Sequence, residues 1–271
     1  MMSMILSGAV ALAAGAASAR WNWWRRKVDG ITILMYHKVG DPPAGSQLKK
    51  LWVSEEMFRR QMAYLADKGH HAITFKDIYA LWDKNIPLPP NPVLITFDDG
   101  YLNNYEKAFP ILRDFGFRAT LFVVVQTVGW DNRWHDPKSE TRINMVSWTQ
   151  LKELQKAGWE IGSHTMNHPN LQKIELKDVK IEMEKSRSII TEFLEEAPNT
   201  FAYPYGSGED VAVIRDKAKE AGYRIAVGVH AGKWDLDGFK ASPFNLPRVF
   251  VRGGETMADF HLQMTRGRSR F

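Results

Sequence analysis

Short apolar segments alternate with amphipathic helical patterns along most of the chain. The apolar segments are bounded by polar residues, Gly or Pro, and several are rich in β-branched and aromatic residues, which is typical of buried strands. We expect strands at residues 31–36, 72–75, 93–97, 119–125, 159–162, 201–203 and 225–229. Apolar residues at helical spacing predict helices at residues 54–69, 76–83, 105–115, 149–157, 176–194 and 210–221. This alternation predicts a parallel sheet covered by helices, and therefore an α/β fold.

Single residues predict where one of these helices begins and ends and where another is interrupted. Ser54 is a suitable N-cap, because acidic residues follow it in the first turn, and Gly69 ends the same helix. Pro110 lies inside the expected helix at residues 105–115 and would kink or divide it.

Composition limits the class of protein without identifying a function. The 271 residues suffice to bury the core of one large domain. Hydrophobic residues make up 44% and charged residues 25%, which is ordinary for a soluble globular protein and argues against collagen-like, disordered and polytopic membrane classes. We expect one domain over residues 28–271.

Residues 1–27 differ in character from the rest of the chain. Residues 4–19 are apolar and small, and Ala17-Ser18-Ala19 is similar to a signal-peptidase site. Basic residues and tryptophans follow this stretch instead of preceding it, which opposes export of the remaining chain. We expect a signal peptide or a membrane anchor, and hence a location at the cell envelope. A frayed helix or a misassigned start is the alternative, which leaves a cytoplasmic location open.

Charge and cysteine content restrict the partners and the chemistry. The formal net charge is +5 and the pI about 9.2, but the basic residues are largely scattered and form no nucleic-acid-binding motif. We therefore expect no nucleic-acid partner, and the oligomeric state leaves no recognisable pattern. Because the chain has no cysteine, His, Asp or Glu must hold any metal.

Polar residues lie at or just after the ends of several expected strands. They are His37, Asp98, Asp99, His164 and Tyr205. Because the active groups of parallel α/β folds gather where strands end and loops begin, we expect these residues to share one functional site.

Two short groups of residues have the composition of a metal site: the pair Asp98 and Asp99, and the pair His164 and His168. Asp98 and Asp99 are adjacent carboxylates after a buried strand, where like charge and burial are unfavourable and a cation would relieve the conflict. Capping of the next turn is the alternative for this pair. His164 and His168 are four residues apart, so both imidazoles could reach one ion from a single helical turn. A structural role is the alternative for the histidines, but the two clusters together favour a metal.

Three motifs follow one another along the chain: Thr-Phe-Asp-Asp-Gly at residues 96–100, Ser-His-Thr-Met-Asn-His at residues 163–168 and Tyr-Pro-Tyr-Gly at residues 203–206. In this order they resemble the first three motifs of the polysaccharide deacetylases, the NodB-like domain of carbohydrate esterase family 4. Leu-Met-Tyr-His at residues 34–37 and Leu-Pro-Arg at residues 246–248 are similar to the branch that contains poly-N-acetylglucosamine deacetylases. The resemblance covers residues 31–252 and implies a single distorted (β/α) barrel, for which we expect seven strands.

The resemblance also implies a role for each matching residue. Asp99, His164 and His168 would bind a divalent metal, usually zinc, although cobalt, nickel and manganese suit the same ligands. The metal would polarise the amide carbonyl and activate a water, and Asp98 would be the general base that takes the proton of that water. The Tyr205 backbone N–H would help to hold the oxyanion, and its ring would line the sugar groove. The implied reaction removes N-acetyl groups from an N-acetylglucosamine-containing envelope polysaccharide.

Two departures from the family pattern concern the base and the acid. Many relatives pair the base with an Arg beside the third motif, where this chain has Ala202. We hypothesise that Arg248 hydrogen-bonds Asp98 instead, with capping of a carbonyl or packing on a ring as the alternative. The general-acid His of many relatives has no clear counterpart. His37 is a better candidate than His261, which lies in an expected surface helix, although His37 could instead orient another group.

Several questions stay open at the level of sequence. An O-acetyl esterase acting on a xylan-like polysaccharide and a catalytically weak carbohydrate-binding relative are the alternative functions, and the polymer itself is undetermined. Trp130 and Trp134 could stack on sugars or pack within their loop. The remaining histidines are expected to be exposed or structural, namely His70, His71, His135 and His230.

Overall fold

The computed structural model describes residues 14–15, 18, 24–138 and 140–269. Much of the expected signal-peptide or anchor segment at residues 1–27 lies outside these residues, so that prediction stays untested. Within the described residues, no helix combines the length and apolar character that crossing a membrane requires.

One parallel sheet forms the centre of the molecule, and seven of its eight strands follow one another in hydrogen-bonded order. That order is β10 (Val249–Phe250), β1 (Thr32–Tyr36), β5 (Pro92–Phe97), β6 (Thr120–Val123), β7 (Glu160–Ser163), β8 (Thr200–Ala202) and β9 (Ile225–Val227). The remaining strand, β4 (His71–Ile73), also pairs with β5. The expected α/β fold and the seven successive strands are confirmed.

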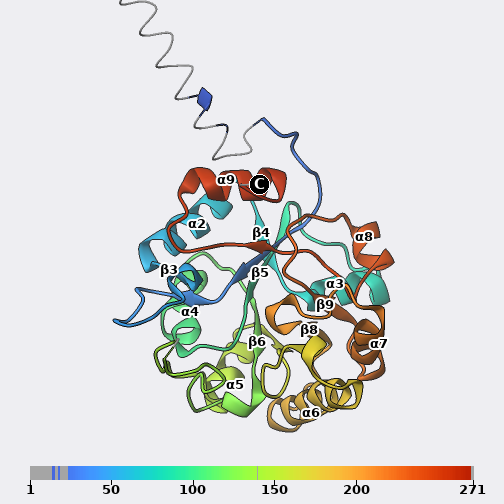
Figure 1. Ribbon diagram of the computed structural model, residues 1–271. Coiled ribbons are helices and arrows are strands. Elements are labelled where there is room, and N and C mark those ends of the chain that lie inside the picture. Colours follow the sequence, from blue (N-terminus) through green and yellow to red (C-terminus); the bar gives the residue numbers. More distant parts are fainter. Residues whose placement is uncertain (1–13, 16–17, 19–23, 139, 270–271) are drawn as a thin grey trace, which may run out of the picture.

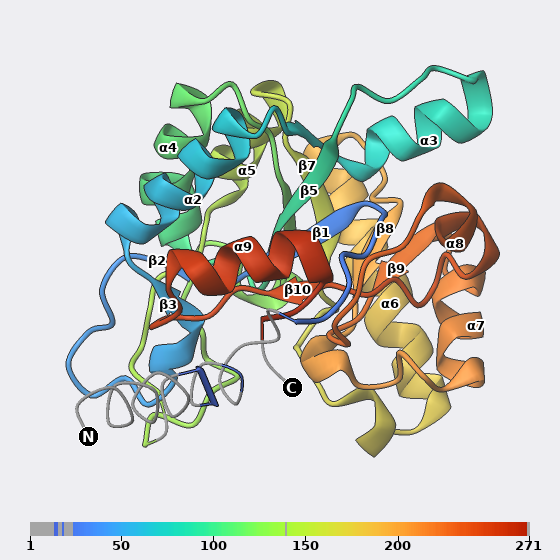
Figure 2. The same cartoon turned by 90° about the horizontal axis from the view of Figure 1, so that it is seen from above.

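The sheet curls into a half-barrel with helices on its outside (Figures 1 and 2). These helices are α2 (Glu55–Asp67), α3 (Phe75–Lys84), α4 (Phe109–Asp114), α5 (Trp148–Lys156), α6 (Leu176–Leu194), α7 (Ala212–Glu220), α8 (Leu236–Ala241) and α9 (Met257–Arg266). The two ends of the strand order approach each other at Leu246, which bridges to Val227 of β9 and precedes β10. Two short strands, β2 (Lys38–Val39) and β3 (Trp52–Val53), form a separate pair beside the barrel mouth.

Local signals account for two helix boundaries. Ser54 caps α2 as expected, because its hydroxyl accepts a hydrogen bond from the Met57 N–H at 3.2 Å. Pro110 divides the expected helix at residues 105–115: a π-helical turn covers Asn104–Ala108, and α4 begins at Phe109. Pro110 is thus in the first turn of α4, where its missing N–H costs no intrahelical hydrogen bond.

Aromatic packing outside the barrel fixes the strands that lead into the candidate site. The Phe97 ring stacks on Trp159 with centroids 5.6 Å apart, and the Tyr36 ring meets Phe58 edge-on at 5.1 Å. All four rings are buried in one core cluster. Since Phe97 and Tyr36 are the last residues of β5 and β1, this packing holds in place the strand ends that carry Asp98 and His37.

Gly162 allows β7 to pack closely between its neighbours. A Cβ at this position would lie 2.5 Å from the ring of Phe122 on β6 and 3.1 Å from the Thr200 carbonyl oxygen on β8. The metal-site candidate His164 follows two residues later, so this close approach also positions the candidate site.

We expect Gly162→Ala to lower the free energy of unfolding by about 1–3 kcal/mol, because the added methyl group overpacks the barrel interior. Urea denaturation would measure the loss. Phe122→Leu removes ring atoms near the new methyl group, so the double variant should lose less stability than the sum of the two single variants. Strict additivity would contradict a clash with this ring.

Candidate active site

Asp99, His164 and His168 form a buried cluster at the carboxyl ends of β5 and β7. One ligand atom from each residue lies within 4.8 Å of the others. The Asp99 Oδ1 atom is 3.5 Å from the Nε2 atom of His164 and 3.3 Å from the Nε2 atom of His168. The structure therefore brings the three expected metal ligands together.

The His164 ring is held with one nitrogen free to act as a ligand. Its Nδ1–H donates a hydrogen bond to the Ala202 carbonyl oxygen at 2.8 Å, which leaves Nε2 directed at Asp99. Burial lowers the pKa of His164 to about 4, although the charges of Asp98 and Asp99 oppose this shift. The imidazole is therefore neutral at pH 7, which is the form that binds a metal.

The segment between the two histidines is a loop, so the expectation that they share one helical turn is wrong. Thr165 and His168 have left-handed backbone conformations, with φ angles of 69° and 59°. The Glu182 carboxylate of α6 accepts hydrogen bonds from the N–H groups of Met166 and Asn167, both at 2.9 Å. This loop, held from outside by α6, directs both imidazoles to the same point.

The donor set fits a divalent metal. Asp99 Oδ1 is buried and accepts no hydrogen bond from any described residue. A buried carboxylate oxygen without a partner is unfavourable, and a cation between it and two imidazole nitrogens would satisfy it. One Asp and two His ligands leave coordination positions open, as a catalytic site requires, and these donors suit zinc, cobalt, nickel and manganese.

Asp98 points to a different partner, Arg248. The two oxygens of Asp98 accept hydrogen bonds from Arg248 Nη1 at 2.6 Å and Nη2 at 2.7 Å. Arg248 is fully buried, and its Nε–H also donates to the Gly228 carbonyl oxygen at 2.7 Å. Its guanidinium lies 5.7 Å from the centroid of the Phe122 ring. The hypothesised Arg248–Asp98 hydrogen bond is present, together with the carbonyl and ring contacts offered as its alternatives.

This ion pair keeps Asp98 ionised inside the protein. Burial, the largest single influence, would raise the pKa of Asp98, but the charge and hydrogen bonds of Arg248, together with the neighbouring His164 and His37, hold the pKa below its ordinary value. An ionised carboxylate next to the metal-site cluster can accept a proton, which is what a general base must do.

His37 and Tyr205 both lie near the same cluster. His37 follows β1 with its Nδ1 buried and without a hydrogen bond to any described residue, and its ring packs against Phe250 at a centroid distance of 5.3 Å. Burial lowers the pKa of His37, against the opposing charges of Asp99 and Asp98. The Tyr205 ring is 58% exposed and meets the His168 ring edge-on at 4.5 Å.

The loop at residues 129–146 contributes residues that sequence reasoning left undecided or placed elsewhere. The Trp134 ring lies 5.1 Å from the His168 ring, whereas Trp130 is 62% exposed and stacks under Arg133. His135, expected to be exposed or structural, brings its Nε2 within 3.5 Å of the Tyr101 hydroxyl. No local pattern marks Trp134 and His135 as site residues, because only the folding back of this loop places them there.

His261 lies on the outside of the barrel. Its Nδ1 is 2.9 Å from the Tyr64 hydroxyl on α2, so its position on a surface helix agrees with the expectation. Of the two candidate acids, only His37 is near the metal-site cluster.

The sequence matches a known family over the part of the chain that holds most of this site. Residues 85–226, more than half of the 271-residue chain, match the family model described as polysaccharide deacetylase. The chain therefore belongs to the polysaccharide deacetylase family. The resemblance inferred from the three motifs is confirmed.

Curated relatives extend the match beyond that range. The protein YxkH of Bacillus subtilis (strain 168), also described as a polysaccharide deacetylase, is 28% identical over 230 residues, or 85% of this chain and 74% of its own length. The poly-beta-1,6-N-acetyl-D-glucosamine N-deacetylase of Staphylococcus aureus (strain MRSA252) is 29% identical over 193 residues, or 67% of this chain. The aligned part spans 64% of the staphylococcal enzyme.

Solved structures share the fold. The deacetylase PplD of Streptococcus pyogenes superposes with a TM-score of 0.72 at 22% identity, covering 89% of this chain and 99% of that one. IcaB from Ammonifex degensii superposes with a TM-score of 0.68 at 24% identity, covering 89% and 97%. The expected barrel of the deacetylase type is confirmed.

We expect Asp99→Asn to lower zinc affinity by at least about 100-fold, because one of three ligands loses its charge. Zinc content after dialysis, measured by elemental mass spectrometry, would test this without any substrate. Asp98→Asn is the matched control, since the Asp98 oxygens bind Arg248, and it should retain zinc. Equal zinc content in Asp99→Asn and wild type would contradict the assignment of Asp99 as a ligand.

Arg248→Met should lower the free energy of unfolding at pH 7 by about 3–5 kcal/mol, because it leaves the buried Asp98 carboxylate without its cation. In wild type the depressed pKa of Asp98 stabilises the fold above the unfolded-state value of about 3.9, and this contribution is lost as the pH falls through the folded-state pKa. In the variant, burial acts without the cation and raises the pKa, so protonation relieves the penalty.

Urea denaturation at neutral and mildly acidic pH would therefore show a smaller difference between Arg248→Met and wild type at the lower pH. Arg248→Lys keeps the charge and should lose less stability at neutral pH. A deficit of the same size at both pH values would indicate lost packing instead of an unpaired carboxylate.

Proposed function

We propose that this protein removes N-acetyl groups from an N-acetylglucosamine-containing polysaccharide of the cell envelope. The observation that carries the proposal is the pair of adjacent buried carboxylates with separate partners. Asp99 faces two histidines, whereas Asp98 is held ionised by Arg248. A site that only binds carbohydrate has no need for an ionised base beside a metal cluster, so the arrangement favours hydrolysis over a binding role.

Asp99, His164 and His168 would hold a divalent metal, which supplies Lewis-acid polarisation of the amide carbonyl and acidification of water. Asp98 would accept the proton of the attacking water, because it is ionised and next to the cluster. Arg248 would keep the Asp98 carboxylate oriented through its two hydrogen bonds.

Tyr205 and His37 would act on the two charges that develop during the reaction. Tyr205 has a left-handed backbone with φ of 58° in a tight turn next to His168, which supports its N–H as a donor to the oxyanion. His37 would protonate the leaving amine, since it lies beside the cluster and is not among the three ligands. Orientation of another group is the alternative for His37.

The name of the staphylococcal relative supports an N-acetyl substrate over the O-acetyl ester of a xylan-like polymer. The rings of Tyr205 and Trp134, both beside His168, support a sugar chain as the ligand, because sugar faces stack on aromatic rings. A location at the envelope rests on the character of residues 1–27 and stays a proposal.

Acetate release would test the proposed reaction. Wild type should release acetate from N-acetylglucosamine oligomers but not from O-acetylated xylan, and a chelator should abolish the activity until zinc is restored. Asp98→Asn should lower kcat by at least about 100-fold while retaining zinc, since the base is lost but the ligands remain. Release from the xylan alone would favour the esterase, and zinc-loaded protein without activity on either substrate would favour the binding role.

A further inference from the structure

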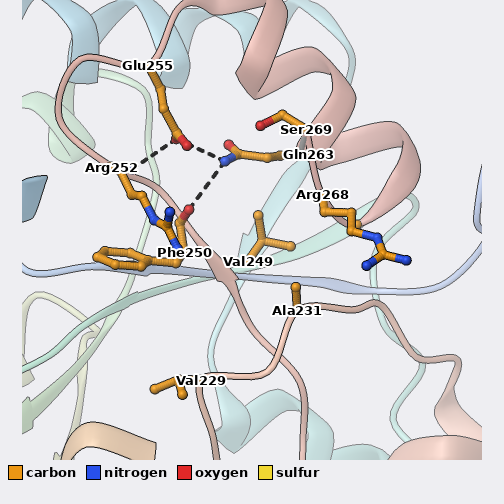
Figure 3. Close-up of a pocket in the computed structure, with 10 residues that line it drawn as sticks. Val229, Ala231, Val249, Phe250, Arg252, Glu255, Gln263, Arg268 and Ser269 are labelled. Atoms are coloured by element: carbon orange, nitrogen blue, oxygen red, sulfur yellow. Dashed lines mark hydrogen bonds between the residues drawn. The ribbon is translucent and has the colours of Figure 1, made fainter. Parts of the chain in front are cut away.

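A pocket of about 170 Å³ lies between β10, the loop after β9 and the carboxyl end of α9, and Phe250, which packs against His37, is part of its lining. Arg252 and Arg268 line it from opposite sides, with Val249 and Gln263 between them (Figure 3). The pocket is smaller than the roughly 300–1,000 Å³ that encloses a whole small-molecule ligand, so it suits a substituent of a larger molecule.

Arg252 connects this pocket to the catalytic residues. Its guanidinium lies 4.9 Å from the centroid of the Phe250 ring, and the same ring packs against His37 at 5.3 Å. One aromatic ring thus separates the Arg252 charge from the candidate acid. A polymer bound across the active site would bring a neighbouring sugar unit to this arginine.

A second hollow of about 420 Å³ continues the basic surface on the other side of Arg252. Lys49 and Lys50 line this hollow together with Arg252. The Gly253 N–H donates a hydrogen bond to the Lys50 carbonyl oxygen at 2.9 Å, and a Cβ on Gly253 would lie 2.1 Å from the Trp52 carbonyl oxygen. The backbone contact therefore fixes the two lysines beside Arg252.

The charges around the two hollows are strongly unbalanced. The four basic residues are exposed and make no ion pair with any residue in the described part of the chain: Lys49, Lys50, Arg252 and Arg268. The acidic residues of the lining are Asp41, which is exposed, and Glu255, which is buried.

The buried acid does little to offset the basic charge. Glu255 is buried, and its Oε2 accepts hydrogen bonds from the backbone N–H of Arg252 and from Gln263 Nε2, both at 2.9 Å (Figure 3). Burial raises the pKa of Glu255, which favours its neutral form further.

A second acid, Glu209, lies next to the lining residue Val229. Its carboxylate accepts a hydrogen bond from the Val229 N–H and lies 3.4 Å from His230 Nδ1, so it already has partners of its own.

We infer that these hollows form an anion-binding subsite for the glycan, which accepts a carboxylate or phosphate carried by a sugar next to the N-acetylated unit. The inference rests on the proposed function and narrows its substrate class to acidic N-acetylated polymers. Arg252 and Arg268 would contact the anionic group from two sides, and Lys49 and Lys50 would attract the flanking chain. A neutral homopolymer would leave these cations without partners.

The test compares oligomers with the same sugar backbone that differ in one substituent. One oligomer alternates N-acetylglucosamine with a carboxylate-bearing sugar, a second is its amidated neutral form, and a third carries phosphate in place of carboxylate. For wild type we expect kcat/KM for acetate release to be about tenfold higher on the matching acidic oligomer than on the neutral one. The acidic oligomer that is preferred identifies the anion. The preference should disappear in about 1 M salt, which screens charges beyond roughly 3 Å.

Arg252→Gln with Arg268→Gln should remove the preference, whereas Arg252→Lys with Arg268→Lys should keep much of it. Arg113→Gln is the matched control, because Arg113 is also exposed and lies over a phenylalanine ring, on α4. It should leave the preference intact. Equal kcat/KM for acidic and neutral oligomers in wild type would overturn the inference, as would a preference that survives the double Gln variant.

Binding measured by calorimetry on zinc-loaded Asp98→Asn separates this inference from the proposed reaction. Tighter binding of an acidic oligomer that depends on Arg252 and Arg268 would support the subsite even if wild type released no acetate. Acetate release with equal binding of charged and neutral oligomers would leave the deacetylase in place and refute the subsite.

Discussion

The active site depends on how two adjacent carboxylates are kept ionised inside the protein. Asp98 and Asp99 are both buried, and burial alone would raise both pKa values. Asp98 has the Arg248 guanidinium as its counter-charge, whereas Asp99 faces His164 and His168, which with Asp99 would hold a cation. Because the two carboxylates have separate partners, Asp98 would be free to act as a base and Asp99 as a ligand.

The pairing of the last strand of the sheet supplies the partner for Asp98. Arg248 is 150 residues from Asp98 in sequence, and the two meet because β10 pairs with β1, which in turn pairs with β5. The buried ion pair therefore links the last strand to the centre of the sheet. A buried pair of this kind contributes little net stability, but losing either partner leaves a charge that the interior cannot solvate. The geometry of the base and the integrity of the barrel thus depend on the same contact.

The surroundings of the metal-site cluster are aromatic on one part and basic on another. The metal-site cluster lies between aromatic rings, with Trp134 and Tyr205 beside His168. From His37 and Phe250 outward, the surface becomes basic over two neighbouring hollows. The site therefore combines stacking surfaces suited to any sugar with a charged surface suited to only some polymers, and the second feature would decide which polymer is bound.

The sequence alone determined the α/β class, the bounds of α6, the Ser54 cap and the three candidate metal ligands that the fold brings together, because each depends on local patterns or on motifs a few residues long. It failed for the loop at residues 164–168, where the backbone N–H groups of Met166 and Asn167 donate hydrogen bonds to the Glu182 carboxylate on α6 and the histidines do not share a helical turn. It also left three roles open for Arg248: a hydrogen bond to Asp98, capping of a carbonyl, or packing on a ring. In the folded protein Arg248 makes all three contacts. The sequence left Trp134 between sugar stacking and packing within its loop, and it gave no indication of the positions of His135 and the basic hollows, because contacts between distant loops depend on how the strands curl and not on any neighbouring residue.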